Sequence, residues 1–145
     1  MADAVTSRYI YPPNWSGSYA ATNQKIGHKR YVLRITNLCD GTGESAVAKI
    51  DISGFLNEVG ATATKIVLEK LDYSVQGFTT VTLLFDHTAD VTAAILVDTE
   101  DGIKDWSTVG GLIDNGTGGA GDLLLTTAGD TAGDTYDITI TFRVK

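Results

Sequence analysis

The last ten residues constrain the fold more than any other part of the sequence. Side chains in this stretch alternate between apolar and polar types without an exception. The apolar set is Tyr136, Ile138, Ile140, Phe142 and Val144, and the polar set is Asp137, Thr139, Thr141, Arg143 and Lys145. A strict two-residue period predicts an antiparallel strand with one face buried and the other in water.

The same period recurs upstream. Residues 31–36 and 46–53 alternate in this way on either side of a turn at residues 40–43, which predicts a hairpin or its equivalent in a sandwich. Residues 65–76 also alternate, but the apolar positions change phase near Glu69 and Lys70. One extra residue in a strand has this effect, so we expect a β-bulge there.

These segments predict about seven or eight strands, with no long helical period and no internal repeat. Further apolar runs of strand length lie at residues 79–86, 93–97 and 123–125. Residues 53–60 have room for one helical turn. The 16 glycines and only 2 prolines suit strands joined by tight turns. We therefore expect an all-β antiparallel sandwich of jelly-roll-like or Ig-like type, with a closed barrel as the alternative.

The first 27 residues differ from the sandwich domain expected at residues 28–145. They contain both prolines and a cluster of aromatic side chains. The candidate contact residues of this segment are Tyr9, Tyr11, Pro12, Pro13, Trp15 and Tyr19. Consecutive prolines favour an extended chain and exclude a central strand. The segment is either a loose terminus with an edge strand or an aromatic arm that packs on a neighbouring subunit.

Charge argues against two classes of partner. The chain has 18 Asp and Glu against 11 Lys and Arg, for a net charge of −7. Nucleic acids and acidic membrane surfaces are bound through Lys and Arg, so neither is an expected partner. We see no signal peptide and no apolar run near the roughly 20 residues of a membrane span. The single cysteine, Cys39, is expected to be a buried thiol at a strand end, in a protein folded in a cytosol.

Catalytic and metal-binding patterns are absent from the sequence. Residues 116–121 match the letters of a dinucleotide-binding fingerprint, but a strand pattern follows where a helix is required. The two histidines, His28 and His87, have no Cys or second His at zinc-ligand spacing, and surface or strand-end positions are expected for both. We predict no enzyme activity and no cofactor.

Two further patterns, one typical of calcium sites and one of sugar-stacking platforms, have simpler interpretations. Aspartates gather in turns at residues 98–102, 114–115, 122, 130 and 134, which resembles Ca²⁺ chemistry. The EF-hand spacing is missing, and Asp is common in turns for its own hydrogen bonds, so calcium remains an alternative only. Trp106 and the aromatic residues of the first 27 residues are expected to be core or interface side chains rather than a sugar-stacking platform.

Several sequence blocks resemble a family of small virion structural proteins of tailed bacteriophages. The blocks are DGTGES (40–45), KIDIS (49–53), IVLEKLDYSVQGF (66–78), VTLLFD (81–86), GGLID (110–114), GDLLLTT (121–127) and GDTYDITI (133–140). The resemblance extends over about residues 29–145. Phe85 stands where the family usually has another aromatic residue, which is a conservative departure.

The resemblance implies a head decoration or cement-like protein. Such a protein binds the outer surface of an assembled head, often as a trimer, and clamps neighbouring major capsid protein subunits. The implied location is the outer capsid surface of the virion, after synthesis in the host cytoplasm. The aromatic residues of positions 1–27 and Trp106 are then the candidate lattice or subunit contacts. The alternatives are another virion component, such as a head fibre base, tail or adhesin module, and a carbohydrate-binding module.

Overall fold

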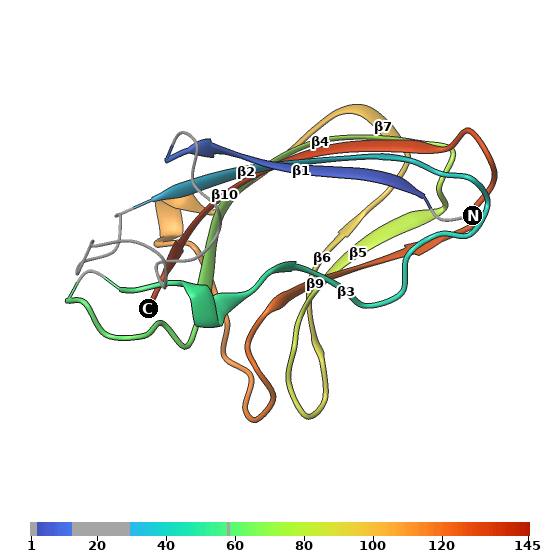
Figure 1. The fold of residues 1–145 in the computed structure, drawn as a ribbon. Helices are drawn as coiled ribbons and strands as arrows, with labels where there is room; N and C mark the ends of the chain where they lie inside the picture. Colours follow the sequence, from blue (N-terminus) through green and yellow to red (C-terminus); the bar gives the residue numbers. More distant parts are fainter. Residues whose placement is uncertain (1–2, 13–29, 58) are drawn as a thin grey trace.

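Two antiparallel sheets face each other in the computed structural model, which describes residues 3–12, 30–57 and 59–145 (Figure 1). The strands are β1 (Ala4–Tyr11), β2 (Tyr31–Leu38), β3 (Val47–Ile50), β4 (Ile66–Gln76), β5 (Thr80–Phe85), β6 (Val91–Leu96), β7 (Thr99–Asp105), β8 (Leu112–Ile113), β9 (Leu123–Ala128) and β10 (Thr135–Val144). Two short 3₁₀ helices, η1 (Ile52–Gly54) and η2 (Ser107–Val109), complete the elements. The predicted all-β antiparallel sandwich is confirmed.

The order of the strands is that of a jelly roll. The larger sheet has the order β1-β2-β10-β4-β7, with β8 beside β4, and the smaller sheet has the order β3-β9-β5-β6. If β1 and β8 are left out and the remaining eight strands are renumbered 1 to 8 in chain order, the larger sheet (β2-β10-β4-β7) has the order 1-8-3-6. The smaller sheet (β3-β9-β5-β6) has the order 2-7-4-5. This is the double Greek-key order of a jelly roll, not an Ig-like order or a closed barrel.

Most connections cross from one sheet to the other, which explains one ambiguity in the sequence. β2 lies in the larger sheet and β3 in the smaller one. The two alternating segments on either side of residues 40–43 are therefore the sandwich equivalent of a hairpin rather than a hairpin. Crossing buries the apolar side of β2. In β3 the register against β9 shifts between Ala48 and Ile50, so Ile50 is buried whereas Ala46 and Ala48, expected on the same apolar side, are exposed.

β4 contains the predicted bulge. Its register against β10 shifts between Thr141 and Phe142, which leaves Glu69 without a residue opposite it. The shift lets Leu68 and Leu71, three positions apart, both lie fully buried in the core. An extra residue in one strand thus explains the change of apolar phase in the sequence.

Three aromatic rings hold one end of the sandwich together. The Tyr31 ring stacks on Phe142 at 5.4 Å between centroids, and Phe55 meets the edge or face of both at 4.9 and 5.7 Å. Phe55 follows η1, so the connection after β3 supplies a core side chain. The helical turn considered for residues 53–60 overlaps η1 only at Ser53 and Gly54, and residues 55–57 and 59–60 are not helical. No helix in the described residues has the length and apolar character needed to cross a membrane.

Candidate interaction surface

β1 contains the first of the predicted contact residues. Tyr9 is half-buried, with its ring 6.4 Å from that of Phe55, and burial followed by the charge of Asp51 raises the pKa of its phenol. Tyr11 is 48% exposed, and Pro12 is buried after a cis peptide bond. The other candidates of this segment, Pro13, Trp15 and Tyr19, lie outside the described residues. β1 therefore presents one aromatic side chain inward and one outward.

Trp106 lies apart from β1. It follows β7, and β1 and β7 are the two opposite edges of the larger sheet. Its ring is half-buried against the core, and its backbone N–H donates to the carbonyl of Glu69 at 2.9 Å. The structure thus does not bring Trp106 together with the aromatic residues of β1, and its packing fits the interpretation of a core side chain.

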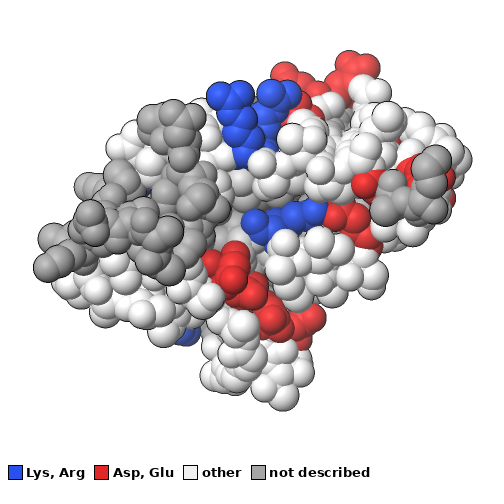
Figure 2. All heavy atoms as spheres, in the orientation of Figure 1, with Lys and Arg blue, Asp and Glu red and all other residues white. Residues whose placement is uncertain are grey.

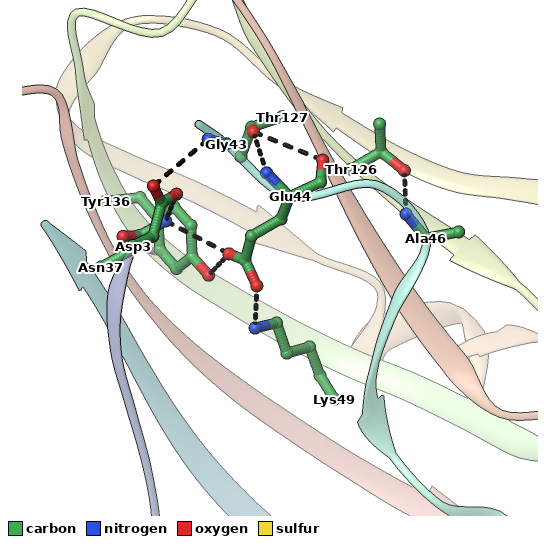
Figure 3. Close-up of polar contacts among 9 residues, drawn as sticks. All are labelled: Asp3, Asn37, Gly43, Glu44, Ala46, Lys49, Thr126, Thr127 and Tyr136. Carbon is green, nitrogen blue, oxygen red and sulfur yellow. Dashed lines mark hydrogen bonds and ion pairs between the residues drawn. The ribbon is translucent and has the colours of Figure 1, made fainter. Parts of the chain in front are cut away.

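The start of β1 is fixed by Asp3 (Figure 3). Its carboxylate accepts hydrogen bonds from the side-chain amide of Asn37 at 3.0 Å and from the backbone N–H groups of Asp40 and Gly43, each at 3.2 Å. Burial opposes ionisation of Asp3, but these hydrogen bonds outweigh it and lower its pKa. β1 is therefore anchored, at the residue just before it, to the end of β2 and the turn between β2 and β3.

Glu44 lies in the interior at the centre of a polar network (Figure 3). Its carboxylate is paired with the ammonium group of Lys49 and accepts hydrogen bonds from the Tyr136 hydroxyl and the Asn37 amide. The Lys49 and Glu44 side chains are only 5% and 6% exposed. The backbone N–H of Glu44 donates to the Thr127 hydroxyl at 2.9 Å. Burial and the Glu44 charge raise the pKa of Tyr136. Apart from the Asn37 side-chain oxygen, which has no hydrogen-bond partner among the described residues, these polar groups contact one another, so the network fixes the crossing from β2 to β3.

This network has a signal in the sequence. Tyr31, Leu33 and Ile35 face the core, and the two-residue period places Asn37 on the same face. A polar residue in an inward position requires a buried hydrogen-bond partner. The sequence thus marks Asn37 as a network residue, but it does not identify Glu44 as the partner.

Cys39 is the buried strand-end thiol expected from the sequence. It is 3% exposed, and its sulfur accepts a hydrogen bond from the Gly41 N–H at 3.3 Å. Burial raises the pKa of this thiol. Because the thiolate is the reactive form, Cys39 is expected to resist alkylation in the folded protein.

His87 forms a second buried polar site just beyond the end of β5, so it takes the strand-end position rather than the surface position of the two that were expected. Its Nε2 lies 2.5 Å from the Asp114 carboxylate and its Nδ1 lies 2.7 Å from the Gly118 carbonyl. Both partners are hydrogen-bond acceptors, and a neutral imidazole has only one N–H to donate. The Gly118 bond, followed by Asp114, raises the pKa of His87 against the opposing effects of burial and Lys65. The geometry fits an imidazolium that fastens the loop of residues 114–121 to the end of β5.

The glycines of residues 116–121 are explained by this close packing. A cavity of about 300 Å³ lies beside them and beside His87. Gly119 has a φ of +64°, and a Cβ there would lie 2.5 Å from the His87 Cα atom. β9 follows the loop, so no helix N-terminus is present to meet a pyrophosphate. The resemblance to a dinucleotide fingerprint therefore reflects loop packing.

Raising the pH is expected to weaken this fastening. Because the folded-state pKa of His87 lies above 6.5, its stabilising effect is complete below pH 6.5 and is lost as pH rises through the folded-state value. The charged groups around it are Asp114, Lys65 and Asp90. The Asp90 carboxylate accepts a hydrogen bond from the backbone N–H of His87, not from its ring. Urea unfolding at pH 6 to 9 should show a decline in wild type that His87→Gln lacks. Equal pH profiles would show that His87 does not titrate in this range.

The outer face of the larger sheet is polar and charged. Arg8 and Arg34 are directly opposite each other on β1 and β2, and Figure 2 shows basic side chains gathered over these strands. Arg34 forms a bidentate ion pair with Asp137 of β10, at 3.0 and 2.7 Å. A shallow groove of about 320 Å³ lies between Arg8 and Arg34, with Thr6 and Thr36 beside them.

No family model, curated protein or solved structure matches the chain. Within residues 3–12, 30–57 and 59–145, no group of three or more His, Cys, Asp or Glu side chains is arranged to hold a metal ion. The fold and the contacts described above are therefore the basis for a functional proposal.

Proposed function

We propose that this protein is a phage capsid decoration, or cement, protein. In this role it binds the outer head surface, contacts the major capsid protein and stabilises the shell lattice. It acts as a homo-oligomer, a trimer in our proposal, without catalysis and without nucleic acid, a membrane or a cofactor as partner. It is made in the host cytoplasm and resides on the outer capsid surface of the virion.

Fold and sequence support this proposal together. The blocks at residues 40–53, 66–86 and 110–140 resemble small virion structural proteins, and the chain folds as a jelly roll. Jelly rolls occur in viral capsid proteins and also in lectins, so the fold alone does not decide between these functions. The interior polar groups Glu44 and His87 are engaged in contacts that fix the structure.

β1 is the observation that carries the proposal. It is an edge strand of the larger sheet and is anchored at its start by Asp3. Val5, Ile10 and Tyr11 on this strand are 38%, 49% and 48% exposed. An edge strand with exposed apolar side chains is typical of a surface that meets another protein. The strand leads directly into the residues that include Trp15.

The direct experiment mixes purified protein with empty heads that lack it. We expect saturable binding at micromolar concentration or below, together with a rise in the temperature at which the heads disassemble. Absence of binding, or binding without any gain in head stability, contradicts a cement function.

Ile10→Asp is expected to lower head affinity at least tenfold, because it places a carboxylate on the exposed apolar part of β1. Half-exposure at this position means that the domain itself should still fold. Val109→Asp is the matched control, since Val109 is an aliphatic residue 76% exposed in η2, beyond the opposite edge of the sheet. Equal head affinities of the two variants would show that β1 is not a contact.

The carbohydrate-binding alternative has less support. A sugar-stacking platform requires exposed aromatic rings in one plane or groove. Trp106 packs against the core instead, at the edge of the sheet opposite Tyr11. Glycan binding that is lost in Trp106→Ala would favour this alternative over the capsid role.

A further inference from the structure

The outer face of the smaller sheet carries no charge. Val81, Leu83 and Phe85 of β5 point into the core, so the residues between them point outward. The register of β3, β9 and β6 then identifies the outward residues on each strand. They are Ala48, Thr80, Thr82, Leu84, Thr92, Ile95, Leu124, Thr126 and Ala128. We call this surface the threonine face.

The threonine face is exceptional in a chain with a net charge of −7. The opposite, outer face of the larger sheet contains Arg8, Arg34, Lys70, Asp72 and Asp137. Four threonines and three large aliphatic side chains occupy the threonine face instead; Ile95 is 52% exposed, Leu84 is half-buried and Leu124 is only 7% exposed. In Figure 1 this face is the side of the lower sheet that is turned away from the upper sheet. Depletion of charge at the centre of a patch is what distinguishes protein interfaces from the rest of a surface.

Aspartates lie at the ends of the same strands. Each of the four strands is followed within two residues by an aspartate, and two strands are also preceded by one. These rim residues are Asp51, Asp86, Asp90, Asp98, Asp122 and Asp130. Within residues 44–56, 78–98 and 121–130, Lys49 is the one Lys or Arg, and it is buried against Glu44. Burial, followed by the charges of Asp51 and Asp86, raises the pKa of Asp122, so these carboxylates influence one another.

We infer that the threonine face docks on a protein surface with an apolar or hydroxyl-rich centre and a rim of Lys and Arg. An uncharged centre avoids the cost of burying ions, and the acidic rim attracts a basic one. A second copy of this chain is the poorer fit, because it would bring the same six aspartates to the rim. This inference rests on the proposed function, in which the partner is the outer surface of the major capsid protein.

Area sets the strength of this contact. β5, β6 and β9 are six residues long and β3 is four, so at a spacing of about 4.8 Å the four strands cover about 360 Å². Stable pairwise complexes bury about 800 Å² on each partner. One threonine face is therefore expected to bind weakly by itself, and tight decoration requires several copies that bind together, as in the proposed trimer.

The test compares two threonines in the same kind of position. Thr82 lies on the threonine face, opposite Thr126 and Ile95, and Thr139 lies on the outer face of the larger sheet, opposite Arg34 and Asp72. Both are half-buried on a central strand. Thr82→Lys should lower affinity for empty heads at least tenfold, and Thr139→Lys should change it less than twofold.

A second readout does not depend on an added charge. Cys39 is buried, so Thr82→Cys and Thr139→Cys each introduce one accessible thiol. Head binding should slow maleimide labelling of the Thr82→Cys variant at least tenfold and leave that of the Thr139→Cys variant unchanged. The Asp86→Asn/Asp98→Asn variant should bind heads more slowly and with a weaker dependence on salt, because it removes rim charge.

The outcomes separate the two proposals. If wild type binds heads but neither Thr82 variant differs from its Thr139 control, the threonine face is not the docking surface, and the decoration function stands. If wild type does not bind heads, the decoration function is contradicted and this inference fails with it. If the free protein associates in sedimentation experiments and Thr82→Lys prevents this, the face is an interface between copies, and the proposed partner is wrong.

Discussion

Replacing Lys49 by Met is expected to lower the free energy of unfolding by about 3–5 kcal/mol. Lys49 and Glu44 are paired in the interior with side chains only 5% and 6% exposed. The substitution leaves the Glu44 carboxylate buried with only the Tyr136 hydroxyl and the Asn37 amide as partners. Urea unfolding followed by circular dichroism measures the change, provided that the slope with urea is unchanged.

Two controls separate loss of the charge pair from loss of packing. The Glu44→Gln/Lys49→Met variant removes both charges and should regain most of the lost stability, because no uncompensated ion remains. Arg34→Met removes an exposed ion pair, with side chains 52% and 42% exposed, and should cost far less stability than Lys49→Met. If Lys49→Met costs as little as Arg34→Met, Glu44 is not buried as described.

The features of the fold that were predicted correctly from the sequence are those that depend on the alternation of apolar and polar residues along one strand. The alternation at residues 136–145 identified the inward and outward sides of β10, and the structure agrees at every described position. The phase change near Glu69 predicted the bulge in β4. Both are properties of neighbouring residues on one strand. The jelly-roll order could not be chosen over an Ig-like order, because it depends on which strands pair across the whole chain.

Two of the contacts that the sequence missed join residues far apart along the chain. His87 and Asp114 are 27 residues apart, and Tyr136 and Glu44 are 92 apart. Neither pair forms a spacing pattern. The threonine face was hidden for a different reason. Thr80 and Thr82 belong to the solvent side of an ordinary strand, and only the pairing with β6 and β9 shows that no charged residue joins them.

In the proposed function, the strength of binding to the head and between copies depends on whether the domain is rigid. Asp3 ties β1 to the turn after β2, and Phe55 packs on Tyr9 of β1, so one aromatic cluster connects the edge strand to the core. A rigid edge loses little conformational entropy on binding. Damage to this cluster is therefore expected to weaken both folding and decoration.

Phe142→Ala is the direct test of that cluster, with an expected cost of about 3–5 kcal/mol. Phe142 is fully buried, stacked on Tyr31 and in contact with Phe55. Removing its ring leaves a cavity between two aromatic side chains that the rigid strands β2 and β10 cannot close.

Thr141→Ala, on the outward side of the same strand, is the matched control and should change stability by less than about 0.5 kcal/mol. Both free energies are measured by urea unfolding, and head binding of Phe142→Ala is measured where the variant remains folded. A loss of less than about 1 kcal/mol in the free energy of unfolding would show that neighbouring side chains move into the space left by the ring. A rigid, close-packed core would not allow this. If Phe142→Ala is strongly destabilised but still folded and binds heads as tightly as wild type, head binding does not depend on packing of the aromatic cluster. A rigid β1 would then not be required for decoration.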